Sequence, residues 1–236
     1  MKNHKVILET PQGGLNGAGL RVGQIKDFLK ASYEDNPPLN IGDYKLDNEL
    51  SNKYGKVYFS VSRKKVAVIF RGTKEALDWG NNLVYTLNSN SYKSTNRYKI
   101  AKKMYENAHK KYKGYKIELL GHSQGGIPTN YLLDTKKDLD GISLNPAYKL
   151  GSIKKNEYII KSNLDPVSVL HKPKELINKV LNPNWNKNHI INIPSKNYNL
   201  LKQHSIDVLN NLDQNKFIGR KEGGSLYNIK STFPFD

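Results

Sequence analysis

The sequence contains no cysteine. Disulfide bonds and thiolate chemistry are therefore excluded, while the redox compartment is left undetermined. Long apolar runs are also missing, since no stretch approaches the roughly 20 residues that a membrane-spanning helix needs. The opening residues, MKNHKVILETPQGG, include a short apolar patch but no signal-peptide core. These absences predict a protein without disulfides, without a secretion signal and without a membrane span.

Acidic residues are few compared with basic ones, because 38 Lys and Arg stand against 21 Asp and Glu, a net charge of +17. The charge could steer the protein toward anionic lipid or nucleic acid, reflect a composition rich in Lys and Asn, or be ordinary solvated surface. The lysines are scattered along the chain rather than gathered in blocks, which favours solvated surface and then an anionic membrane surface. No nucleic-acid-binding motif is present, so we expect no nucleic acid partner.

The 236 residues, 37% hydrophobic and 25% charged, suit one domain with a sizeable core. Apolar runs typical of strands alternate with helical patterns: strands at 55–62, 64–73, 115–120, 139–145, 157–164 and 189–194, and helices at 24–34, 98–112, 126–134 and 201–212. This alternation predicts an α/β protein whose mostly parallel central sheet is flanked by helices. We expect a flexible Gly-rich segment over 1–20, the folded domain over 21–215, and a tail over 216–236.

Residues 121–125 read Gly-His-Ser-Gln-Gly, which fits the pattern Gly-x-Ser-x-Gly. A serine at a tight strand-to-helix turn takes strained backbone angles, and side chains two residues before and after it would collide. Glycine at both places relieves the collision, and the expected strand before and helix after provide the required context. The start of that helix also points N–H groups at a developing oxyanion. We therefore predict that Ser123 is a nucleophile rather than part of an ordinary turn.

A serine hydroxyl needs a base and an orienting acid, which α/β-hydrolases supply in the chain order Ser, Asp, His. Three histidines follow Ser123, namely His171, His189 and His204. We favour His204, beside the last expected helix, because His189 opens a strand-like run and His171 closely follows the acid candidate. That candidate, Asp165, ends a buried-type strand at the carboxyl edge of the sheet, where catalytic groups collect. Its alternative is a turn-forming aspartate.

Five segments in this order, VAVIFRGT, DWGNNL, IELLGHSQGG, NLDPVSVL and HSIDVL, resemble the class three lipase family, which includes filamentous fungal triacylglycerol lipases. The resemblance covers about residues 25–212 and implies an α/β-hydrolase fold. Proteins with lipase-like domains of this type also occur in large DNA viruses and their mobile relatives, so a viral or mobile-element member is one reading of the resemblance. It implies that Ser123 is the nucleophile, Asp165 the acid and His204 the base.

The resemblance also implies an oxyanion hole formed by the backbone N–H groups of Thr73 and Gln124. Thr73 follows a buried-type strand, so a fixed donor there could face the serine. The sequence departs from the family in carrying Gln124 where leucine is usual and Pro128 where a small helix former is usual. Residues 75–87, whose apolar face includes Trp79, occupy the family's position for a lid, with an ordinary packed helix as the alternative.

We therefore expect a serine ester hydrolase, lipase-like or phospholipase-like, that cleaves lipid or other acyl esters through a Ser-His-Asp triad and an acyl-enzyme. No metal or cofactor is expected. The alternative is a catalytically silent hydrolase-fold binding protein or a virion-associated membrane-interaction protein, since residues 15–19, LNGAG, resemble sites cut by adenovirus-type maturation proteases. The expected location is the cytoplasm or a virion, with peripheral contact to an anionic membrane surface.

Overall fold

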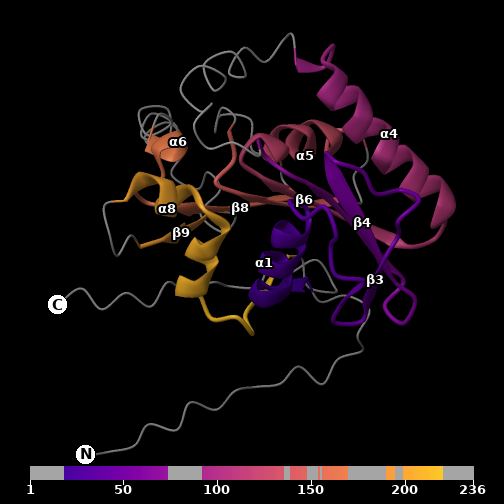
Figure 1. Cartoon of the computed structure of the whole chain (residues 1–236), viewed down its shortest axis with the longest axis horizontal. Coiled ribbons are helices and arrows are strands. Elements are labelled where there is room, and N and C mark those ends of the chain that lie inside the picture. The colour runs from indigo at the N-terminus through magenta and orange to yellow at the C-terminus, as the bar shows by residue number, and fades with distance from the viewer. Residues whose placement is uncertain are drawn as a thin grey trace, which may run out of the picture.

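The structure is a computed structural model of the whole chain (Figure 1). It describes residues 19–73, 92–135, 139–147, 154, 156–169, 190–194 and 199–219. The expected lid segment with Trp79, the histidines at 171 and 189, and residues 15–18 lie outside the described residues.

An eight-stranded sheet in the order β2-β3-β4-β5-β6-β7-β8-β9 forms the centre of the molecule. The strands are β2 Asn40–Ile41, β3 Tyr44–Leu46, β4 Gly55–Ser60, β5 Lys65–Phe70, β6 Lys116–His122, β7 Asp140–Leu144, β8 Glu157–Ser162 and β9 Ile190–Ile193. Strands β5 to β9 pair in parallel, whereas β2 to β5 form an antiparallel edge. Every residue of β5, β7 and β8 is buried, as expected of strands that are covered on both faces.

Helices cover both faces of this sheet (Figure 1). They are α1 Val22–Ala31, α4 Asn96–Lys111, η2 Ser123–Gly125, α5 Gly126–Leu132, α6 Pro166–Val169, α8 Leu200–His204 and η4 Ile206–Asn211. Among the described helices, none is both long enough and apolar enough to cross a bilayer. Pro128 is the third residue of α5, within the first turn, where backbone N–H groups have no intrahelical acceptor.

The two faces of the sheet have separate hydrophobic cores, because successive strand side chains point to opposite sides. In β5, Ala67 and Ile69 pack with α1 and η4, whereas Val66 and Val68 pack with α4 and α5. The helix expected over 24–34 is present as α1 at Val22–Ala31, and Ile25, Phe28 and Leu29 form its buried face. These two cores hold the middle strands rigidly, so the loops at their carboxyl ends start from fixed positions.

The ends of the expected domain differ slightly from the structure. Strand β1, Leu20–Arg21, pairs with β10, Phe217–Ile218. Leu20 and Ile218 are both buried. The paired strands β1 and β10 thus lie a few residues past the bounds 21 and 215 of the expected domain, because Leu20 and Ile218 are buried against the rest of the fold.

The single helix expected over 201–212 is wrong, because the chain breaks at Ser205. Helix α8 ends at His204, and Ser205 is extended, with φ −70° and ψ 159°. The Ser205 side chain accepts a hydrogen bond from the backbone N–H of Asp207 at 3.2 Å and so caps η4. Serine favours such capping positions over helix interiors. The break places His204 at a helix end rather than within a longer helix.

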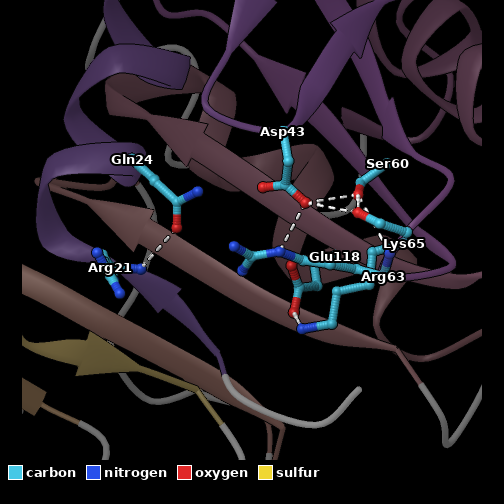
Figure 2. Close-up of polar contacts among 8 residues, drawn as sticks. Arg21, Gln24, Asp43, Ser60, Arg63, Lys65 and Glu118 are labelled. Atoms are coloured by element: carbon cyan, nitrogen blue, oxygen red, sulfur yellow. Dashed lines mark hydrogen bonds and ion pairs between the residues drawn. The ribbon is translucent and has the colours of Figure 1, made fainter. Parts of the chain in front are cut away.

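Charged groups at the amino-terminal end of the middle strands are paired (Figure 2). Lys65, the first residue of β5, contacts Glu118 of β6 with Nζ to Oε1 at 3.0 Å, and both side chains are buried. Nearby, Asp43 accepts hydrogen bonds from the Ser60 hydroxyl at 2.7 Å and from Arg63 Nε at 2.8 Å. Burial would raise the pKa of Asp43, but these two partners lower it below its ordinary value. This cluster stabilises the end of the sheet opposite to the carboxyl ends of the strands.

Candidate active site

Ser123 lies where β6 passes into η2, at the carboxyl end of a middle strand. Its backbone φ is 53°, in the left-handed region that residues other than glycine rarely adopt. The residue is 7% exposed. Strained backbone of this kind persists only where the surroundings enforce it, and it gathers at functional sites.

The two glycines around Ser123 are required by close backbone contacts. A Cβ atom at Gly121 would lie 2.4 Å from the carbonyl oxygen of Gly125. A Cβ atom at Gly125 would lie 2.0 Å from the carbonyl oxygen of Phe70, the last residue of β5. The collision across the turn that the motif predicts is therefore present. The second contact, between Gly125 and Phe70 of β5, cannot be predicted from the motif.

Asp165 and His204, 39 residues apart, meet next to the carboxyl ends of the strands. Asp165 follows β8 and is fully buried, and His204 ends α8 with 2% of its surface exposed. His204 Nδ1 lies 2.5 Å from Asp165 Oδ1. The backbone N–H of Asp165 donates to the carbonyl of Ser162 at 3.2 Å, which holds the turn before α6. An imidazole that donates from Nδ1 to a carboxylate is basic at Nε2.

His122 connects this pair to the serine turn. The carbonyl oxygen of His204 lies 2.8 Å from His122 Nε2, and the two rings are 5.2 Å apart between centroids. His122 directly precedes Ser123, so His204 lies beside the turn. Asn145, which follows β7, adds a second tie to α8, because its side-chain amide donates to the carbonyl of Gln203 at 3.0 Å.

Tyr33, which follows α1, contacts the other side of the serine turn. Its hydroxyl lies 2.6 Å from His122 Nδ1 and accepts the backbone N–H of Gly72 at 2.7 Å. A Cβ atom at Gly72 would lie 2.8 Å from Ser123 Cβ, so the segment after β5 packs directly against the serine. Thr73 is the next residue and is half-buried, as is Gln124 in η2. The segments that carry both expected oxyanion donors therefore adjoin Ser123.

Burial dominates the protonation of the groups around Ser123. It raises the pKa of Tyr33 to about 12, although the Gly72 N–H and the charges of Arg97 and Arg71 act against it. It lowers the pKa of His122 to about 3, helped by the charge of His204. At neutral pH Tyr33 is therefore a protonated phenol and His122 a neutral imidazole.

Two arginine side chains, Arg71 and Arg97, place positive charge near Tyr33 at this site. The Arg97 guanidinium donates to the carbonyl of Arg71, in the segment that joins β5 to Gly72. Burial lowers the pKa of Arg97, with the charge of Arg71 acting in the same direction.

In the part of the chain that the structure describes, no group of three or more His, Asp or Glu side chains is arranged to hold a metal ion.

Sequence reasoning missed the contacts that Tyr33 and Asn145 make around the candidate site. Nothing in the sequence near Tyr33 marks it, because its partners lie 39 and 89 residues away. His122 is part of the Gly-x-Ser-x-Gly motif, so the sequence predicts its position beside the serine. The sequence does not predict its two partners, Tyr33 and the carbonyl of His204.

The strand order and the serine turn together define the class of this protein. A strained residue between two glycines, at the carboxyl end of a middle parallel strand and followed by a helix, has the geometry of the elbow turn of the α/β-hydrolase fold. The predicted fold class is therefore confirmed.

Comparisons with known proteins found similarity to one family model and to several solved structures. The Mbeg1-like family model matches residues 37–142, which include the elbow. A comparison with curated proteins found no match. The resemblance to fungal lipases that the sequence predicts is also found among solved structures.

Three of these solved structures are fungal lipases. Lip2 lipase from Yarrowia lipolytica is 13% identical over 64% of this chain and 73% of its own, with a TM-score of 0.46. Rhizomucor miehei lipase in a propeptide complex is 16% identical over 72% of each chain, with a TM-score of 0.46. A triacylglycerol lipase from Penicillium expansum is 19% identical over 63% of this chain and 70% of its own, with a TM-score of 0.41.

Proposed function

We propose that this protein is a serine ester hydrolase in which Ser123 is the nucleophile, His204 the base and Asp165 the orienting acid. The observation that carries the proposal is the buried contact of 2.5 Å between Asp165 and His204 next to a strained serine turn. A buried carboxylate is costly unless it is paired, and the pairing of Asp165 with the His204 imidazole supports this assignment.

The proposed reaction has two stages. His204 Nε2 takes the proton of Ser123 Oγ as this oxygen attacks the ester carbonyl carbon, and the backbone N–H groups of Thr73 and Gln124 stabilise the oxyanion. The C–O bond to the alcohol breaks, and the alcohol leaves with the proton from His204. Water, deprotonated by His204, then attacks the acyl-enzyme, the bond to Ser123 Oγ breaks, and His204 returns the proton to Ser123 Oγ as the acid leaves. Asp165 keeps the Nδ1–H tautomer and stabilises the imidazolium in both stages.

Hydrolysis of p-nitrophenyl acyl esters tests this proposal. Ser123→Ala should lower kcat/KM by at least about a thousandfold, because the residual rate then comes only from binding and oxyanion stabilisation. A fluorophosphonate probe should label Ser123 in the unmodified protein. Ser62→Ala, an exposed serine in the turn between β4 and β5, is the matched control and should keep full activity. Equal turnover by the Ser123 variant would refute the assignment.

An anionic phospholipid is the substrate that the charge favours. The net charge is +17, and the Arg71 and Arg97 charges act on Tyr33 beside the serine turn. Attraction of an anionic interface raises its local concentration and weakens with added salt. Hydrolysis of anionic vesicles should therefore exceed that of zwitterionic vesicles at low salt. Equal rates on both would contradict this refinement and leave the esterase assignment standing.

A further inference from the structure

A continuous chain of hydrogen bonds passes behind Ser123 and joins four segments of the fold. The backbone N–H of Gly72 donates to Tyr33 Oη at 2.7 Å, Tyr33 Oη lies 2.6 Å from His122 Nδ1, and His122 Nε2 lies 2.8 Å from the carbonyl oxygen of His204. These groups come from the ends of β5, α1, β6 and α8.

The partners determine the direction of every bond in this chain. A carbonyl oxygen can only accept, so His122 Nε2 must carry the proton that points at His204. His122 is neutral at working pH, since its pKa is about 3, so its Nδ1 is an acceptor. The Tyr33 hydroxyl therefore donates to Nδ1 and accepts from Gly72. All three bonds run in the same sense, an arrangement in which each bond polarises and strengthens the next.

We propose that Tyr33 and His122 are positioning residues that hold the oxyanion segment and the backbone of the base in register with the nucleophile. The proposal rests on the function proposed above. Gly72 precedes Thr73, His122 precedes Ser123, and the last acceptor is the backbone of His204 itself. Neither Tyr33 nor His122 needs to touch the substrate to act in this way.

Filling space in the core does not by itself require a tyrosine at 33 or a histidine at 122. A phenylalanine at 33 and an aliphatic residue at 122 could fill similar volume without burying polar atoms, which are costly when unpaired. The hydroxyl and both ring nitrogens are all used, and each of them reaches a different segment. Positioning matters because displacing a reacting group by about 1 Å can cost on the order of a hundredfold in rate.

Tyr33→Phe is the direct test, with Tyr58→Phe as its matched control. Both changes remove a single hydroxyl, and Tyr58 Oη donates to the carbonyl of Pro38 at 2.7 Å, a contact in the antiparallel part of the sheet. For p-nitrophenyl butyrate we expect Tyr33→Phe to lower kcat by about tenfold or more with KM changed less than about threefold, since only one link to an oxyanion-hole segment is lost. Tyr58→Phe should lower the melting temperature by a similar amount and leave kcat unchanged. Equal kcat in the two variants would overturn the proposal.

His122 allows a second test through a conservative variant. His122→Gln keeps a side-chain donor that can reach the carbonyl of His204, whereas His122→Leu keeps none. We expect kcat to fall further for His122→Leu than for His122→Gln at equal folded content by circular dichroism. Equal kcat values in these two variants would show that the bond to His204 does no positioning.

The controls separate this proposal from the proposed function. An unmodified protein that neither hydrolyses esters nor reacts with a fluorophosphonate at Ser123 would defeat the esterase assignment. An active, labelled unmodified protein with Tyr33→Phe equal to Tyr58→Phe would defeat the positioning role alone.

Discussion

Gly125→Ala tests how closely the serine turn depends on its contact with β5. The new Cβ would lie 2.0 Å from the carbonyl oxygen of Phe70 and 2.7 Å from its carbonyl carbon, where real Cβ contacts essentially never fall below 3.0 Å. The difference, 3.0 − 2.0, requires a shift of about 1 Å. Both partner atoms are backbone of a central strand, so they cannot swing aside as a flexible side chain would. The segment with Gly72 and Thr73 must then move relative to Ser123.

This shift should affect activity more than stability. We expect a loss of kcat/KM on the order of a hundredfold, the usual effect of a displacement of about 1 Å at a reacting group. Overpacking of this kind costs about 1–3 kcal/mol of unfolding free energy, which urea denaturation can measure. Ester hydrolysis by the purified variant, measured well below its unfolding midpoint, reports the activity.

Gly114→Ala is the matched control for this prediction. Gly114 lies in the turn between α4 and β6 with φ +85°, and an added Cβ would meet no atom within 4 Å. The left-handed conformation alone should cost about 1–2 kcal/mol, with no change in kcat. Full activity in Gly125→Ala, or an equal loss of activity in both variants, would refute the reasoning.

Asp165→Asn should lower kcat by about 10⁴-fold in ester hydrolysis, because an amide favours the wrong imidazole tautomer, and a loss below tenfold would contradict its role. Lys65→Met should cost about 3–5 kcal/mol in urea unfolding by leaving Glu118 buried without its cation, while adding Glu118→Leu should recover most of this loss. Stability should fall as pH decreases from 6.5 toward 3, because burial lowers the pKa of His122 from 6.5 to about 3 and only the unfolded chain takes up that proton. His122→Gln should flatten this loss between pH 6.5 and 4.5, and a slope equal to that of the unmodified protein would exclude His122 as the source.

The helices and strands near the site were predictable because their patterns are local. The buried run of β5, the amphipathic face of α1 and the glycines around Ser123 each express a rule that acts over a few residues. The helix expected over 201–212 failed for the same reason, since its apolar spacing continues through Ser205. The Ser205 hydroxyl caps η4 and so interrupts the helix. Whether the chain continues the helix or breaks at Ser205 depends on where η4 packs.

The order of the chain by itself determined the elbow, the strand that precedes it, and a short set of acids and bases that could serve it. Tertiary structure alone decided that Asp165 meets His204 and that Tyr33 and His122 join Gly72 to the backbone of His204. Propensity and periodicity act between neighbours along the chain. Contacts across 39 to 89 residues exist only once strands β5 to β9 have paired in one order and brought their carboxyl ends to the same edge.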